Sequence, residues 1–178
     1  MLAAQELTLF RSPESRWSFV IWKLPFEVRG LGELGRLTVS TQDSYGRLTS
    51  LYSLHLLLLA EGDSILTPPD TPNERCILET PAARQSVSGG SVPVSGRMRP
   101  FNDQPVVVEL IAQDQTLLGS QEINVPIAPD GGYVPFHVDV PYTINRGMWA
   151  LLVLRQADHR IPGLMYLYSQ EIFLSASP

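Results

Sequence analysis

The N-terminal third of the chain repeats part of the C-terminal half, and this internal repeat is the strongest constraint on the fold. Residues 5–26 (QELTLFRSPESRWSFVIWKLPF) lie without a gap over residues 121–142 (QEINVPIAPDGGYVPFHVDVPY), an offset of 116 positions. The triplet LYS at 51–53 lies over a second LYS at 167–169 with the same offset. Self-similarity at a fixed spacing is typical of like modules arranged along one chain. The repeat therefore predicts two modules of one kind.

Both copies read as short strands separated by turns. The runs are aliphatic, aromatic or β-branched, and turn formers such as Ser12-Pro13-Glu14-Ser15 stand between them. No window sustains a 3.6-residue period over helical length, so no long helix is expected. The predicted fold class is all-β. The predicted strands are 7–10, 17–24, 36–42, 51–59, 77–80, 91–98, 106–112, 117–125, 133–140, 149–155 and 165–174.

The downstream copy has the strand pattern of an immunoglobulin-like β-sandwich. About seven short strands with turn signals between them fit a sandwich domain of about 100 residues. Side chains alternate across a strand, so His137 and Asp139 are expected on the solvent face of 133–140. The opposite face then carries Val134, Phe136, Val138 and Val140. Trp149 opens a strongly apolar strand and is expected in the core.

The upstream copy corresponds only to the later strands of such a module. LTVSTQ at 37–42 lies over LLVLRQ at 151–156, but counterparts of 77–117 are missing upstream. The predicted organisation is a partial module at 1–66, a proline-rich linker at 67–75 and a complete module at 76–178. The tandem is therefore one partial and one complete sandwich.

An incomplete sandwich exposes an edge and an inner face, and both favour association. Apolar side chains on both faces of strand 17–24 suggest that each face is covered. We therefore expect the partial module to pack against the complete one or against a second chain, giving a homo-oligomer in the second case. The residues predicted to contact a partner are Trp17, Phe19, Ile21 and Trp22.

The bulk composition excludes several classes of partner. The net charge is −5 and the basic residues are dispersed, which argues against binding nucleic acid or an anionic membrane. Cys76 is the only cysteine, so no intrachain disulfide is possible. The longest aliphatic run, 56–60, is too short to span a bilayer, and the sequence MLAAQELTLF is not that of a signal peptide.

No stretch of the sequence carries a catalytic motif. SVSGGSVPVSG at 86–96 lacks the Gly-x-Ser-x-Gly spacing of a nucleophile elbow, and no Lys-Ser or Lys-Thr follows it to bind phosphate. Zinc sites need several His, Cys or carboxylate ligands in short spacings. None of the three histidines, His55, His137 and His159, has another His or a Cys within a few residues. We therefore predict that the protein is not an enzyme and that it binds neither a metal ion nor a cofactor.

Acidic residues near the loops of the downstream copy also suggest a calcium site as an alternative. Loop carboxylates at Asp130, Asp139 and Asp158 are of the type that can bind calcium. The stretch PDGG at 129–132 is, however, an ordinary turn sequence, and the turn interpretation is favoured.

The motif ILETPAARQSVSGGSVPVSGRMRPFN at 77–102 resembles a known family. It has the order of the immunoglobulin-like domain of bacterial spore-germination-associated and other envelope proteins: strand, Thr-Pro, Val-Ser turn, Pro-Val-Ser-Gly, then an aromatic residue, here Phe101. The resemblance covers 77–175. The segment 157–160 departs from it, because it lacks a glycine-containing pattern.

This resemblance implies a non-enzymatic, structural or adhesive module of the cell envelope, placed outside the cytoplasm. Its expected partner is a protein or a cell-wall polymer. The alternative is a carbohydrate- or peptidoglycan-binding module, which needs an exposed Trp or Tyr lined by Asp, Asn or Gln.

Overall fold

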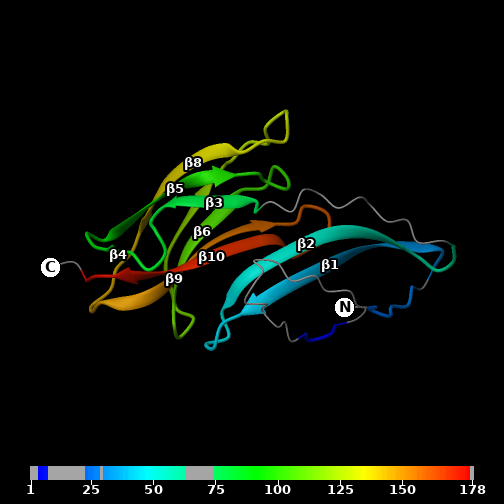
Figure 1. Ribbon diagram of the computed structural model, residues 1–178, viewed down its shortest axis with the longest axis horizontal. Helices are drawn as coiled ribbons and strands as arrows, with labels where there is room; N and C mark the ends of the chain where they lie inside the picture. Colours follow the sequence, from blue (N-terminus) through cyan, green and yellow to red (C-terminus); the bar gives the residue numbers. More distant parts are fainter. Residues whose placement is uncertain (1–3, 8–22, 29, 63–73, 177–178) are drawn as a thin grey trace, which may run out of the picture. The chain divides into compact units, whose positions relative to one another are not determined.

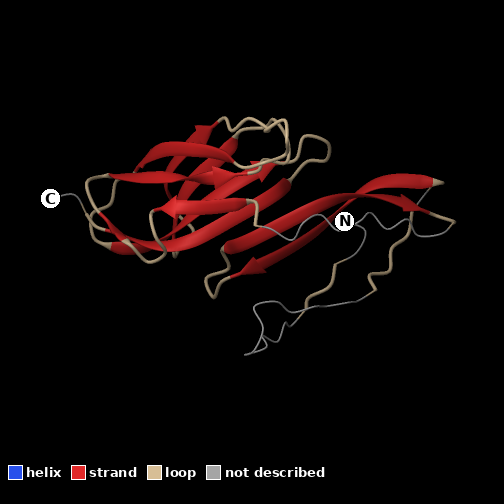
Figure 2. Ribbon diagram, turned by 45° about the horizontal axis from the view of Figure 1, so that its top comes forward, coloured by secondary structure: helices blue, strands red, loops and turns tan. Residues whose placement is uncertain are grey.

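A computed structural model describes residues 4–7, 23–28, 30–62 and 74–176. Across these residues the secondary structure consists of strands, and none of them is helical (Figure 2). The predicted all-β class is confirmed. The strands are β1 (Gly32–Gln42), β2 (Leu48–Leu59), β3 (Cys76–Thr80), β4 (Ser86–Val87), β5 (Ser91–Met98), β6 (Val106–Ala112), β7 (Leu117–Ile123), β8 (Val134–Pro141), β9 (Met148–Ala157) and β10 (Leu164–Leu174).

The predicted strands of the downstream copy agree closely with these bounds. Strands 91–98 and 106–112 are found with the predicted ends, as β5 and β6. The two-residue strand β4 has no counterpart among the predicted strands. Strand 7–10 and strand 17–24 lie largely outside the described residues, as does most of the predicted linker.

Contacts divide the chain into two compact units. The smaller unit contains Met1–Gly35 and Leu56–Leu66, and the larger unit contains Arg36–His55 and Thr67–Pro178. The repeat places its predicted boundaries elsewhere, at 66 and 75. The difference arises because β2 pairs with β10, which joins residues of the upstream copy to the sheet of the downstream copy.

The described strands form two sheets. One has the strand order β1-β2-β10-β9-β6-β7, with β4 pairing in parallel to β10, and the other has the order β3-β5-β8 (Figure 1). Their facing side chains form one buried cluster, so the two sheets pack as a β-sandwich. The cluster includes Val92, Val94 and Met98 of β5, Phe136, Val138 and Val140 of β8, Val106, Val108 and Leu110 of β6, Ala150, Leu152 and Leu154 of β9, and Tyr166, Ile172 and Leu174 of β10.

Strand β8 follows the predicted alternation. Phe136, Val138 and Val140 are buried, while His137 and Asp139 are exposed. A sheet with one face on the core and the other in water gives this pattern. The sequence was therefore sufficient to orient β8.

Strand β9 is buried on both faces, and this overturns the prediction for Trp149. Ala150, Leu152 and Leu154 point into the sandwich, whereas Leu151 and Val153 belong to a second buried cluster on the opposite face. Trp149 shares that opposite face at the end of the strand and is 37% exposed. Its ring stacks edge-on against Phe173, with 5.3 Å between the ring centroids. The core prediction was wrong because a continuous apolar run does not say which face a residue occupies.

The pairing of β2 with β10 coincides with the internal repeat. Leu51 lies opposite Leu167, and these are the first residues of the two LYS triplets. On either side, Tyr52 lies opposite Tyr166 and Ser50 lies opposite Tyr168. The repeat aligns Tyr52 with Tyr168 and Ser50 with Tyr166. It therefore relates the pair Tyr52–Tyr166 to the pair Tyr168–Ser50. Equivalent segments therefore meet antiparallel, as they would across a two-fold axis.

Candidate functional site

The four residues predicted to contact a partner, Trp17, Phe19, Ile21 and Trp22, lie outside the described residues. Within the described part of the smaller unit, apolar side chains are nevertheless exposed. Leu31 is 93% exposed and Leu57 is 69% exposed. We call the set Leu31, Leu34, Leu57 and Leu59 the leucine patch.

Two glycines of β1 lie against leucine side chains of β2. Gly32 and Gly35 lie so close to Leu59 and Leu58 that an added Cβ would come within 3.0 Å and 2.8 Å of their side chains. The leucines of β2 therefore lie across bare backbone of β1, and the Ala60 amide donates to the Leu31 carbonyl at 3.3 Å. Leu57 and Leu59 nevertheless remain exposed, and exposed apolar surface can mark an interaction site.

In the larger unit, a charged cluster fastens β1 and β2 to the turn between β9 and β10. Asp158 Oδ2 accepts a hydrogen bond from Arg36 Nη1 at 3.1 Å and contacts His55 Nε2 at 2.8 Å. Arg36 also donates to the carbonyls of Ile161 and Pro162, at 2.9 Å and 3.0 Å. The Asp158 side chain has no exposed surface.

These hydrogen bonds change the acidity of Asp158. Burial alone would raise the pKa of its carboxyl group, because it disfavours the charged form. Hydrogen bonds from the Arg160 amide, His55, the Ile161 amide and Arg36 outweigh burial and lower the pKa to about 2. Asp158 is therefore a carboxylate held by surrounding donors, which is a structural arrangement.

Of the other histidines and the calcium-type carboxylates, His137 and Asp139 lie on β8, whereas Asp130 and His159 lie in loops. His137 and Asp139 are both exposed on β8, with 3.9 Å between Nε2 and Oδ2. Asp130 Oδ1 accepts from the Gly132 amide at 2.9 Å, as in an ordinary turn. The described residues contain no group of three or more His, Cys, Asp or Glu side chains that could hold a metal ion.

Cys76 is a buried free thiol at the start of β3. Burial, followed by the charge of Glu74, raises its pKa to about 12. The thiol is therefore protonated at neutral pH, and a nucleophile or metal ligand would need the thiolate. Its role is packing, since it belongs to the core between the sheets.

Comparisons with known proteins do not identify this chain. No protein-family model matches it, and no curated protein matches it. Among the described residues, no helix is long and apolar enough to cross a membrane.

Proposed function

We propose that this chain is a non-enzymatic structural and adhesive module of the cell envelope that associates with a second copy of itself through the leucine patch. The exposure of Leu31, Leu34 and Leu57 is the observation that carries the proposal. Burying a leucine side chain contributes about 1.5–3 kcal/mol, so a surface of several leucines supplies a useful driving force.

A second copy is the favoured occupant because equivalent segments already pair within one chain. Leu51 of the upstream copy and Leu167 of the downstream copy meet antiparallel between β2 and β10. Two-fold dimers are the commonest homo-oligomers, and their interface brings the same surface patch of the two copies into contact.

The envelope setting is supported by the resemblance of 77–175 to the immunoglobulin-like domain of envelope proteins. An extracytoplasmic protein is expected to be digested when protease is added to intact cells, while a cytoplasmic marker survives. Digestion only after the cells are lysed would contradict the proposed location.

The double variant Leu34→Ser, Leu57→Ser is expected to be a monomer where the native chain is a dimer. Loss of two buried leucines raises the dimer dissociation constant at least about 100-fold. Light scattering over a concentration series measures this. Leu117→Ser removes an exposed leucine from β7 of the larger unit and is the matched control, expected to dimerise like the native chain. A native chain that stays monomeric throughout would sink the proposal.

Partial exposure of Trp149 supports one alternative, a carbohydrate- or peptidoglycan-binding module. An exposed indole beside the Phe173 ring offers an apolar face on which a sugar can stack. This alternative predicts retention of the native chain on purified peptidoglycan, and loss of most of that retention in Trp149→Ala. Equal elution of the two proteins would exclude it.

A further inference from the structure

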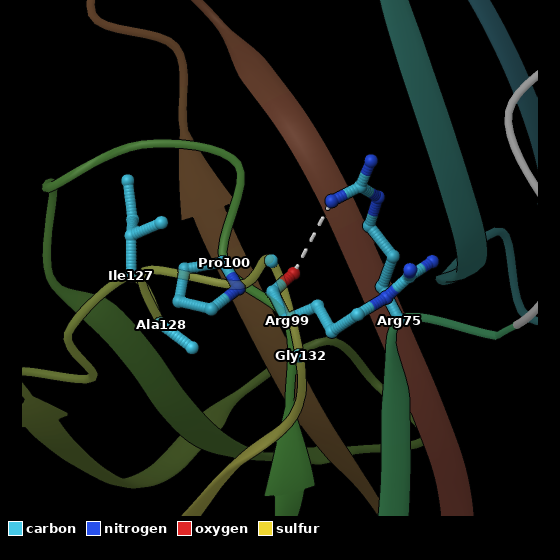
Figure 3. Close-up of a pocket in the computed structure, with 7 residues that line it drawn as sticks. Arg75, Arg99, Pro100, Ile127, Ala128 and Gly132 are labelled. Carbon is cyan, nitrogen blue, oxygen red and sulfur yellow. Dashed lines mark hydrogen bonds between the residues drawn. The ribbon is translucent and has the colours of Figure 1, made fainter.

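A small pocket in the larger unit brings two arginines together (Figure 3). Arg75 precedes β3 and Arg99 follows β5, and antiparallel pairing of these strands sets the two residues side by side. The Arg99 amide donates to the Arg75 carbonyl at 2.8 Å, and Arg75 Nη1 donates to the Arg99 carbonyl at 3.5 Å. The pocket holds about 240 Å³, and its other walls are Pro100, Ile127, Ala128 and the Gly131–Gly132 turn.

The guanidinium of Arg99 is incompletely satisfied. Its Nε and Nη2 atoms are buried and make no hydrogen bond, and none of the ion pairs seen in the described part of the chain includes Arg99. Its guanidinium carbon lies over the Tyr133 ring, 5.3 Å from the ring centroid. A buried donor without an acceptor is costly, and more so when it is charged. Such a group calls for a partner.

Stacking fixes the other guanidinium at the pocket. The Arg75 guanidinium carbon lies 3.7 Å from the centroid of the Phe101 ring, and Phe101 in turn packs against Tyr52 and Tyr166. A planar guanidinium on an aromatic face loses little further freedom when it binds a ligand. The positive charge of Arg75 is therefore held in place beside the pocket.

The acidic residues that neighbour the pocket in sequence have other hydrogen-bond donors. Glu74 accepts from the Tyr166 hydroxyl and from the Arg75 amide. Asp130 accepts from the Gly132 amide within its own turn. Neither carboxylate pairs with Arg99 among the described residues. A bound anion could therefore supply the negative charge and the hydrogen-bond acceptors that this guanidinium lacks.

We propose that this pocket binds a carboxylate carried on a short apolar stem, with the Arg99 guanidinium as its principal partner. The guanidinium fork matches a carboxylate geometrically, and charge-assisted hydrogen bonds are the strong ones. The stem would rest on Pro100, Ile127 and Ala128, which phosphate could not use. The pocket is smaller than the sites that take drug-sized ligands, so it suits a short acid or one acidic side chain. This inference is independent of the proposed self-association, which involves the leucine patch of the smaller unit.

Titration of the full chain with butyrate tests the proposal. At constant ionic strength, we expect saturable shifts of the Gly131 and Gly132 amide signals in two-dimensional NMR spectra, and weaker binding of inorganic phosphate. A parallel titration uses N-acetylglutamate α-amide, which carries only the side-chain carboxylate. Tighter binding of butyrate would indicate a free short acid as the ligand, and tighter binding of the glutamate derivative would indicate an acidic side chain. Absence of saturable shifts up to about 50 mM of either acid, or phosphate binding as tight as theirs, would overturn the proposal.

Variants of Arg99 and of Arg97, two residues earlier in β5, assign the binding to Arg99. Arg99→Gln is expected to raise the dissociation constant at least about tenfold, because charge-assisted hydrogen bonds are lost. Arg97→Gln removes the same charge two residues earlier, from an exposed pair with Glu79 at 3.0 Å, and is expected to leave the constant within about twofold. Equal constants in both variants would refute the assignment.

A stability measurement separates a binding residue from a structural one. Without ligand, Arg99→Gln is expected to melt no lower than the native chain, because it removes a buried cation that lacks a partner. Butyrate is expected to raise the melting temperature of the native chain and of Arg97→Gln but not of Arg99→Gln. If Arg99→Gln does not fold, Arg99→Lys keeps the charge without the fork and is expected to weaken binding. Undiminished binding in Arg99→Lys would refute the role of the fork.

Discussion

Gly96→Ala is expected to destabilise the larger unit by about 3 kcal/mol or more. A Cβ at this position would lie 2.4 Å from the Ile77 carbonyl oxygen, 3.1 Å from the Leu78 Cα and 3.2 Å from the Phe136 ring. The first two atoms are backbone, so relief requires β3 and β5 to move apart. Because whole domains are stable by only about 5–15 kcal/mol, this is a large share of the total. Urea unfolding followed by circular dichroism measures the loss.

Gly30→Ala is the control for this substitution. No atom of the described residues lies within 4 Å of a Cβ built there, so the change in unfolding free energy is expected to stay within about 0.5 kcal/mol. A Gly96→Ala variant with the native urea midpoint would mean that β3 and β5 do not approach as closely as described here.

The contrast between β8 and β9 shows how far strand periodicity can predict this fold. One face of β8 is in water, so period-two alternation is visible in its sequence and assigns Phe136 to the core. Both faces of β9 are buried over most of its length, so alternation is lost and Trp149 could not be placed. The second buried cluster exists because β2 supplies Leu51 on that side. Nothing local to β9 contains that information.

The side-chain clusters were harder to predict than the strands, because they join residues far apart in the chain. Asp158 and Arg36 are separated by 122 positions, and Asp158 and His55 by 103. The sequence placed Asp158 near a loop and His55 in an aliphatic strand, and both placements hold. That the two residues meet depends on the pairing of β2 with β10, which local patterns do not specify.

The arginine pocket was missed for a related reason. Neither Arg75 nor Arg99 belongs to a charged run or a motif, so each reads as an ordinary residue beside a strand. The one available signal was that 77–80 and 91–98 were predicted as successive strands, a pattern that favours antiparallel pairing and would bring the ends of these strands together. Even that places the backbones only. The lack of an acceptor for Arg99 is a property of packing and becomes visible only in three dimensions.

Asp158→Asn is expected to destabilise the larger unit by about 2–3 kcal/mol at pH 7 and to flatten its acid dependence. Removing one partner of a buried pair costs about 3–5 kcal/mol, and we use a lower range because Arg36 and His55 are 18% and 19% exposed. The folded pKa of Asp158 is about 2, below the ordinary value of 3.8. A depressed pKa stabilises the fold above the ordinary value, and this contribution is lost as the pH falls from 3.8 toward 2.

The measurement is urea unfolding at several pH values between about 2 and 7, a range that takes carboxyl groups from protonated to ionised. The native chain is expected to lose about 2 kcal/mol through Asp158 across the acidic part of this range, and Asp158→Asn is expected to lack that component. Asp139→Asn is the control. The Asp139 carboxylate is exposed on β8 near His137, so the stability of Asp139→Asn at pH 7 should match that of the native chain. If Asp158→Asn had the acid dependence of the native chain, the Asp158 carboxylate would not be stabilised by Arg36, His55 and the turn amides, and its role in attaching β1 and β2 to the β9–β10 turn would be excluded.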